Sequence, residues 1–200
     1  MEFESANSSI VKSIRQRDLL NAWLRLYARD RSTPRFDEYE PERLEDERLD
    51  LVHYTVEAER QPPRLTIQSE GTRMAHAYGH TGKGRALDDY LGPRLAPIVM
   101  PAYYECIARR LPVYTIAHID DIYGRLVAYE RLLLPFGEGG QITRIIASLK
   151  TICEDGHFEI KNLMRGGDKL PVQKLCATID RDLFHRAPGR LAAPDALEFD

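Results

Sequence analysis

The segment spanning residues 111–153 constrains the fold of this chain more than any other. It contains three runs rich in Val, Ile, Leu, Tyr and Thr, near residues 113–119, 125–135 and 142–151. Gly124 separates the first two runs, and glycines at 137, 139 and 140 separate the last two. Such residues suit a pleated, half-buried sheet. The short joins connect antiparallel neighbours, because a parallel return needs a long crossover. The segment therefore predicts a three-stranded antiparallel meander.

Two further strands and several helices are predicted ahead of this meander. Alternating apolar residues predict strands at residues 49–57 and 64–69, joined by a proline-containing turn. Apolar residues spaced three and four apart predict a leading helix over residues 13–30 and a longer helix that ends near Arg110. A short helical turn is expected before Gly79. The predicted order is helix, two strands, short helices, helix and three strands.

The length of 200 residues fits one domain with extensions. Residues 1–12 are predicted to be a loose leader, residues 13–153 a single domain, and residues 154–200 a C-terminal extension. A stripe of Val172, Leu175, Cys176, Ile179 and Leu183 predicts a helix over about residues 171–185. The tail beyond this helix is expected to be mobile.

Composition narrows the class of protein. The net charge of −3 lacks the basic excess that neutralises phosphates, so nucleic acid is not expected as a partner. The three cysteines (Cys106, Cys153 and Cys176) form no CxxC pair and are interpreted as reduced thiols. No apolar run approaches the roughly 20 residues that span a bilayer. We therefore expect a cytoplasmic protein without membrane insertion.

The familiar sequence motifs of catalytic and metal sites are absent or incomplete in this chain. The glycine-rich segment 79–84 lacks the spacing and the hydroxyl of a phosphate-binding loop. His76 and His80 have the spacing of two ligands on one helix face, but no third ligand stands near them. The chain has no GxSxG elbow. We therefore predict no metal, no catalytic residue and a protein that is not an enzyme.

The acidic segment 37–50 is predicted to be a solvated surface with a short helix. Eight of its fourteen residues are Asp or Glu. The alternatives are a cation site and a surface that binds a basic partner, but the carboxylates lack the alternate spacing and the glycine of a calcium loop.

One strand carries charge toward the core. In residues 127–134, Tyr129 and Arg131 share one strand face, and Glu130 lies on the other. Whichever face is inward, a charge is brought into or beside the core, where it must be paired or must meet a polar ligand. Between these alternatives, a structural salt bridge is favoured over a ligand.

Several motifs together resemble a bacterial family of stand-alone PAS-like sensory proteins. They are the leading helix with Trp23, Pro34-Arg35, Gly71-Thr72-Arg73, His80-Thr81-Gly82, residues 109–114 (RRLPVY) and residues 129–135 (YERLLLP). The resemblance covers about residues 14–152, and the last motif is the most specific. It implies an α+β fold with a five-stranded antiparallel PAS-like sheet, strand order 2-1-5-4-3, helices on one face and a leading N-terminal helix.

The resemblance also implies a place for a ligand. PAS domains bind small molecules between sheet and helices, and this implies cavity candidates at Met74, Tyr103, Cys106, Tyr114, His118, Tyr129 and Arg131. The family's flavin-type Asn-Cys-Arg-Phe-Leu-Gln run does not occur in the chain, and no His lies between Pro93 and Arg110, where haem-binding members carry an axial ligand. We therefore predict neither flavin nor haem and no other cofactor.

The leading helix has two interpretations. Its apolar stripe consists of Leu19, Leu20, Trp23, Leu26 and Tyr27. The stripe either anchors the helix on the core or packs against its twin in a dimer. Because symmetric dimers are the commonest assembly, we predict a homodimer in which this stripe meets the outer face of the sheet.

The predicted function is that of a non-enzymatic PAS-like sensor or adaptor in cytoplasmic signal transduction. It is expected to bind a small ligand, a signalling protein partner, or both. The alternative is a small enzyme that uses the curved sheet as an active-site cavity, with His118, Tyr114 or Arg131 converging on it.

Overall fold

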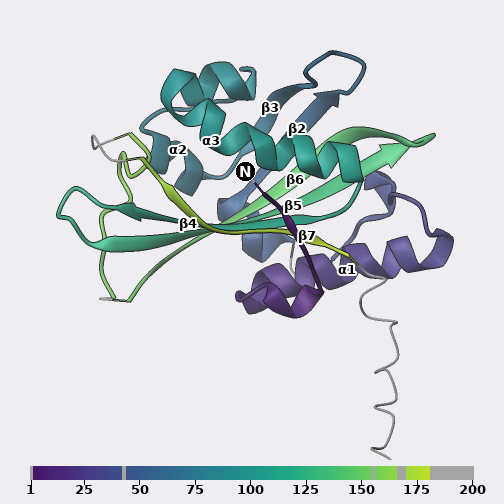
Figure 1. Cartoon of the computed structure of the whole chain (residues 1–200), viewed down its shortest axis with the longest axis horizontal. Coiled ribbons are helices and arrows are strands. Elements are labelled where there is room, and N and C mark those ends of the chain that lie inside the picture. The colour runs from purple at the N-terminus through teal and green to yellow at the C-terminus, as the bar shows by residue number, and fades with distance from the viewer. Residues whose placement is uncertain (1, 42–43, 155, 166–169, 181–200) are drawn as a thin grey trace, which may run out of the picture.

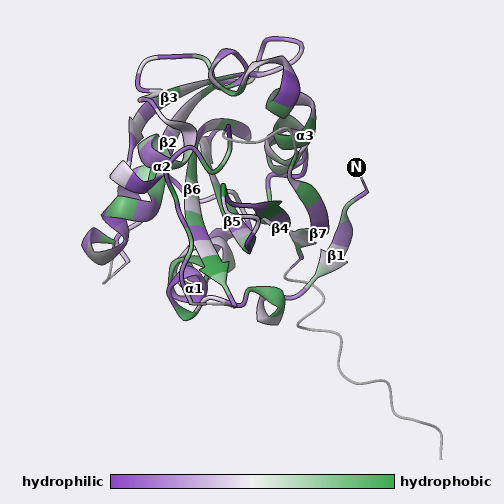
Figure 2. Ribbon diagram, turned by 90° about the vertical axis from the view of Figure 1, so that its left-hand side faces the viewer, coloured by the Kyte–Doolittle hydropathy of each residue, from purple (hydrophilic) through white to green (hydrophobic). Residues whose placement is uncertain are grey.

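A computed structural model describes residues 2–41, 44–154, 156–165 and 170–180. A seven-stranded sheet lies between helix α1 (Ile14–Asp30) on one face and helices α2 (Thr72–Tyr78) and α3 (Leu87–Arg109) on the other (Figure 1). Three short 3₁₀ helices occur at Ser8–Ile10, Phe36–Glu38 and Glu45–Asp50. The three layers are also seen from the side in Figure 2, where strands separate α1 from α3.

The strands run across the sheet in the order β1-β7-β4-β5-β6-β2-β3. Their bounds are β1 Glu4–Ala6, β2 Leu51–Glu57, β3 Arg64–Glu70, β4 Val113–Asp120, β5 Leu126–Glu138, β6 Gln141–Cys153 and β7 Val172–Ile179. Every pairing is antiparallel except that of β1 with β7, which is parallel. The β5–β6 hairpin turns at Gly139 and Gly140, whose φ angles of 61° and 84° suit residues without a Cβ.

The α+β class is confirmed, but the five-stranded antiparallel PAS-like sheet is wrong. Strands β2 to β6 do lie at the predicted positions. However, β7 pairs with β4 and β1 adds to β7, so the sheet is seven-stranded and mixed. The leading helix predicted over residues 13–30 is α1, and it covers the face of the sheet opposite α2 and α3.

The helix predicted over residues 171–185 is wrong where the structure describes it, because residues 172–179 form β7. The periodicity of a short apolar run does not by itself distinguish a helix from a strand. Here the unpaired edge of β4 decides the outcome, since it offers hydrogen-bonding groups to a neighbouring strand. Residues 181–185 lie outside the described part of the chain. The leader predicted to be loose contains β1, and that prediction is wrong for residues 4–6. The sheet therefore includes strands from both sides of the predicted domain 13–153.

Helix α1 is fastened to the sheet of its own chain. The Trp23 indole N–H donates to the carbonyl oxygen of Pro135 at 2.7 Å, and the Gln16 amide donates to the carbonyl oxygen of Ser148 at 2.9 Å. The Tyr39 hydroxyl donates to the carbonyl oxygen of Leu19 at 2.9 Å. Ser13 caps the first turn by accepting a hydrogen bond from the Gln16 N–H.

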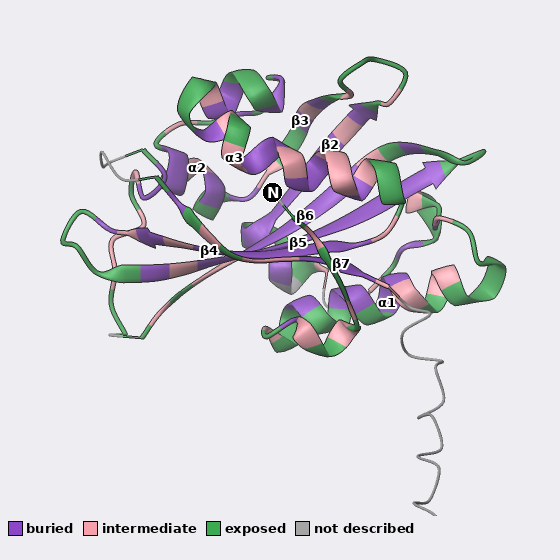
Figure 3. Ribbon diagram, viewed as in Figure 1, coloured by how far each residue is buried: buried purple, intermediate pink, exposed green. Residues whose placement is uncertain are grey.

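This packing accounts for the apolar stripe of the leading helix within a single chain, and the homodimer itself stays a prediction. Leu19, Leu20 and Trp23 are fully buried within the chain, and Leu26 and Tyr27 are partly buried. Figure 3 shows the buried side of α1 turned toward the sheet. Of the two interpretations of the stripe, the one in which the helix anchors on the core describes the structure. The three buried side chains have no surface left for a partner.

The acidic segment is less solvated than its composition suggests. Glu47 and Asp50, on the 3₁₀ helix before β2, are buried. Lys150 on β6 lies between them, and Arg15 and Arg73 complete the network from α1 and α2. The prediction of a solvated surface is therefore wrong at these two carboxylates, which tie the segment to three elements.

Residues 156–165 pack over helix α2. The backbone N–H groups of Asn162 and Met164 donate to the carbonyl oxygens of His76 and Ala77, each at 2.9 Å. A side chain at Gly79, whose φ is 78°, would meet the Asn162 amide, which explains the glycine there.

Helix α3 is kinked at Gly92. Within the described residues, no helix combines the length and the apolar character needed to cross a membrane.

Candidate functional site

Arg131 is buried in the centre of the molecule. It lies on β5, opposite Thr115 of β4 and Leu149 of β6, and its side chain is on the face covered by α2 and α3. Only 3% of the residue is exposed. Its guanidinium Nε and Nη1 atoms have no hydrogen-bond partner in the structure. An arginine side chain stays protonated in proteins, so this is a buried positive charge.

Four tyrosines surround this charge, and we call them the tyrosine cage. They come from four different elements: Tyr54 from β2, Tyr78 from α2, Tyr103 from α3 and Tyr129 from β5. The Arg131 Cζ atom lies 5.6 Å from the ring centroid of Tyr103 and 5.6 Å from that of Tyr129. The hydroxyl of Tyr103 donates to the hydroxyl of Tyr54 at 3.0 Å. The cage therefore offers aromatic faces and hydroxyl groups around one cation.

The cage tyrosines are neutral at physiological pH. Burial raises the pKa of Tyr129 to about 12, although the charge of Arg131 acts in the opposite direction. Burial also raises the pKa of Tyr103, and it raises the pKa values of Tyr54 and Tyr78 well above their ordinary value. None of the phenols therefore balances the guanidinium.

No carboxylate in the described part of the chain forms an ion pair with Arg131. The salt bridge favoured from sequence is therefore not formed there. Taking an ion out of water costs several kcal/mol unless charge and hydrogen bonds compensate it. Cation–π contacts return about 2 kcal/mol at desolvated sites. The Nε and Nη1 atoms of Arg131 are left without an acceptor, and a small anion supplies both an acceptor and the opposite charge.

The opposite face of the same strand is also buried. Glu130 is 1% exposed and lies on the α1 side of the sheet. Its Oε2 atom accepts a hydrogen bond of 2.8 Å from the Tyr114 hydroxyl, which in turn accepts one of 3.3 Å from the backbone N–H of Lys12. Strand β5 thus buries a charge on each face, and the sheet separates the two.

The structure divides the predicted cavity residues between the two faces of the sheet. Met74, Tyr103, Cys106, Tyr129 and Arg131 are buried together on the α2/α3 side. Burial raises the pKa of the Cys106 thiol well above its ordinary value, so that this cysteine is neutral.

Tyr114 and His118 point to the α1 side, since they alternate with Thr115 and Ala117 along β4. The set of His118, Tyr114 and Arg131 invoked for an enzyme is therefore not assembled around one cavity.

Two cage members were missed from the sequence. Tyr54 belongs to the buried face of β2, and its alternation with Val52 and Val56 marked that face. Tyr78 lies one helical turn after Met74 on α2. These local signals place each tyrosine on a buried surface. Only the pairing of β2 with β6 and the packing of α2 on the sheet bring the two tyrosines close to Arg131.

Among the described residues, no cluster of three or more His, Cys, Asp or Glu side chains has the arrangement of a metal site. The side chain of His80 lies beside the Tyr78 carbonyl oxygen, with its Nδ1 atom 3.0 Å away.

No family model, no curated protein and no solved structure matches this chain.

Proposed function

We propose that this protein is a non-enzymatic, cytoplasmic sensor that binds a small anionic molecule inside the tyrosine cage. The observation that carries the proposal is the buried guanidinium of Arg131, which has two nitrogen atoms without a hydrogen-bond partner and no carboxylate partner among the described residues. A ligand carboxylate or similar anion supplies the missing charge and accepts the free hydrogen bonds. Arg is the side chain best suited to such planar anions.

The chemistry of the cage supports a ligand with an apolar part. The cage belongs to a buried cluster of aromatic and aliphatic side chains that also contains Met74 and Leu149. Pockets for small molecules are mostly apolar, with a few polar groups that fix orientation. A small organic acid meets both conditions, with its charged group at Arg131 and its apolar part among the rings.

The position of the cage supports a sensing role. Its members come from two strands and two helices, so occupancy changes how α2 and α3 pack on the sheet. A ligand shifts a conformational equilibrium only by its differential affinity for two states, and a buried cation that is compensated in one state supplies such a difference. In this proposal the output passes through a protein partner that reads the outer surface of the helices.

Native mass spectrometry of the purified protein tests the proposal. We expect a small-molecule adduct on the wild-type chain and none on an Arg131→Met variant. The variant removes the charge and keeps a long apolar side chain. After removal of ligand by unfolding and refolding, Arg131→Met should be more stable than the wild type by about 1–4 kcal/mol in urea unfolding, because a buried charge is replaced by an apolar group.

Arg64→Met is the matched control, because Arg64 is an exposed arginine on β3. It should keep the adduct and change stability by less than about 0.5 kcal/mol. If refolded wild-type protein carries no adduct from a cell extract and Arg131→Met is less stable than it, water compensates the charge and the proposal is wrong.

A further inference from the structure

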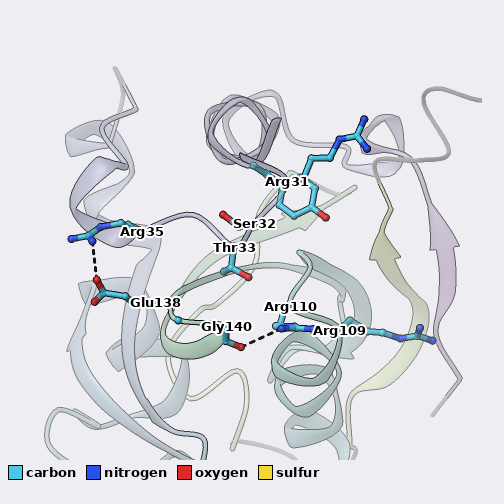
Figure 4. Close-up of a pocket in the computed structure, with 11 residues that line it drawn as sticks. Arg31, Ser32, Thr33, Arg35, Arg109, Arg110, Glu138 and Gly140 are labelled. Carbon is cyan, nitrogen blue, oxygen red and sulfur yellow. Dashed lines mark hydrogen bonds and ion pairs between the residues drawn. The ribbon is translucent and has the colours of Figure 1, made fainter. Parts of the chain in front are cut away.

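A surface pocket of about 450 Å³ lies where three chain segments meet. They are the C-terminal end of α1 with the residues after it, the C-terminal end of α3, and the hairpin between β5 and β6. Figure 4 shows Thr33 between the α1 end and the hairpin, with Arg110 reaching toward Gly140. No residue that lines this pocket belongs to the tyrosine cage, so the pocket is a separate site.

Positive charge dominates the pocket. Four arginines line it, at positions 31, 35, 109 and 110, against the single carboxylate of Glu138. Arg35 is paired with Glu138 and Asp37, each at 2.8 Å, and Arg109 is paired with Glu105 at 3.1 Å. The other two have no carboxylate partner within the described ranges: Arg110 donates to the Gly140 carbonyl oxygen at 3.3 Å, and neither Arg110 nor Arg31 forms an ion pair there.

These two arginines occupy backbone positions that favour glycine. Arg31 ends α1 with φ 52° and ψ 28°, and Arg110 ends α3 with φ 58° and ψ 30°. Both are left-handed helix caps, where a Cβ is unfavourable and glycine is the usual residue. Departures from local preference are expected at functional or strained sites.

Neutralisation of the helix dipoles does not account for this choice. A cation near a helix C-terminus is favourable, but α1 already has Arg29 in its last turn and α3 already has Arg109. Glycine caps at 31 and 110 would keep that compensation and relieve the backbone. The side chains at these two caps therefore serve something outside the two helices.

We propose that this pocket binds the phosphate group of a small, soluble, phosphorylated molecule. Arginine N–H groups bind phosphate through charge-assisted, bidentate hydrogen bonds. Tyr27, Ser32 and Thr33 add hydroxyl groups to the lining, and the glycines of the hairpin leave its backbone accessible. The volume lies within the range of about 300–1,000 Å³ for small-molecule sites, so the ligand extends beyond its phosphate.

The test is a titration of isotopically labelled full-length protein with inorganic pyrophosphate, followed by amide chemical shifts at constant ionic strength. We expect saturable shifts in the segments 31–33, 109–110 and 137–140. The variant Arg31→Gly/Arg110→Gly removes both unpaired charges and supplies the residue that each cap prefers. Its fold should therefore be kept, and its affinity should fall about tenfold for each arginine removed.

Arg17→Gln/Arg25→Gln is the matched control, since it removes two charges from exposed positions of α1. It should keep the wild-type affinity within about twofold, because charges a Debye length apart are screened. The proposal fails if pyrophosphate causes no saturable shifts, if the shifts map elsewhere, or if the control variant weakens binding as much as the glycine variant. A glycine variant that binds as tightly as the wild type also overturns it.

Discussion

Replacing Lys150 by methionine is expected to destabilise the protein by about 3–5 kcal/mol, because it removes the buried cation that Glu47 and Asp50 share and leaves each carboxylate only an exposed arginine partner. The Lys150 Nζ atom lies 2.5 Å from Glu47 Oε2 and 2.5 Å from Asp50 Oδ2. The contact with Asp50 is also a hydrogen bond, whereas that with Glu47 is an ion pair only. Lys150 is 12% exposed, and the two carboxylate side chains are 1% and 5% exposed, so water does not replace the lysine.

Chemical denaturation of Lys150→Met, followed by circular dichroism, measures this effect. Arg73→Met is the matched control, because Arg73 binds Asp50 from the surface with more than half of its side chain exposed. Exposed partners of this kind contribute about 0.2–1 kcal/mol. Equal losses for the two variants would show that the lysine holds no special place in the network.

Replacing Trp23 by alanine is the second large expected effect, with a loss of about 3–5 kcal/mol in the free energy of unfolding. The indole is fully buried, stacks on Tyr27 with ring centroids 5.2 Å apart, and donates its N–H to the Pro135 carbonyl oxygen. The substitution leaves a cavity between α1 and the sheet and removes the donor of a buried carbonyl. Circular dichroism is the appropriate probe, because Trp23 is the only tryptophan of the chain.

Trp23→Phe separates the two contributions. It keeps most of the apolar contact but removes the N–H, so a smaller loss of about 1–3 kcal/mol is expected from the unsatisfied carbonyl. Leu24→Ala, at a partly buried position of the same helix, is the control for the loss of a smaller apolar contact. A Trp23→Ala variant that keeps wild-type stability but changes its sedimentation would instead restore the dimer interpretation of this helix.

The strands that the sequence located are those whose signals are local. The runs of Val, Ile, Leu, Tyr and Thr in residues 113–119 and 142–151, with glycines at the hairpin, are enough to place β4 and β6. Strand β7 was missed because its apolar residues also fit a helical stripe, and the decision rests with the free edge of β4. The contribution of β1 depends in turn on β7, so the error at one strand carried over to the next.

The candidate site was predictable only strand by strand. Alternation put Tyr129 and Arg131 on one face, and the structure agrees. It left open which face is buried, and α1 buries the second face as well, which brings Glu130 into the interior. The surroundings of Arg131 come from separate elements, among them β2, α2 and α3, which meet only in the folded chain. The periodicity of a single strand therefore cannot show whether Arg131 has a counter-ion.

The parallel pairing of β1 with β7 has a consequence for how the sheet is completed during synthesis. Residues 4–6 leave the ribosome before every other strand of this sheet, yet the strand they pair with is made more than 160 residues later. Until residues 172–179 emerge, β4 presents an unpaired edge of the kind that recruits strands from other chains. Slow synthesis or a pause between β6 and β7 therefore lengthens the exposure of a half-finished sheet, and aggregation of nascent chains should be most sensitive to translation speed in that interval.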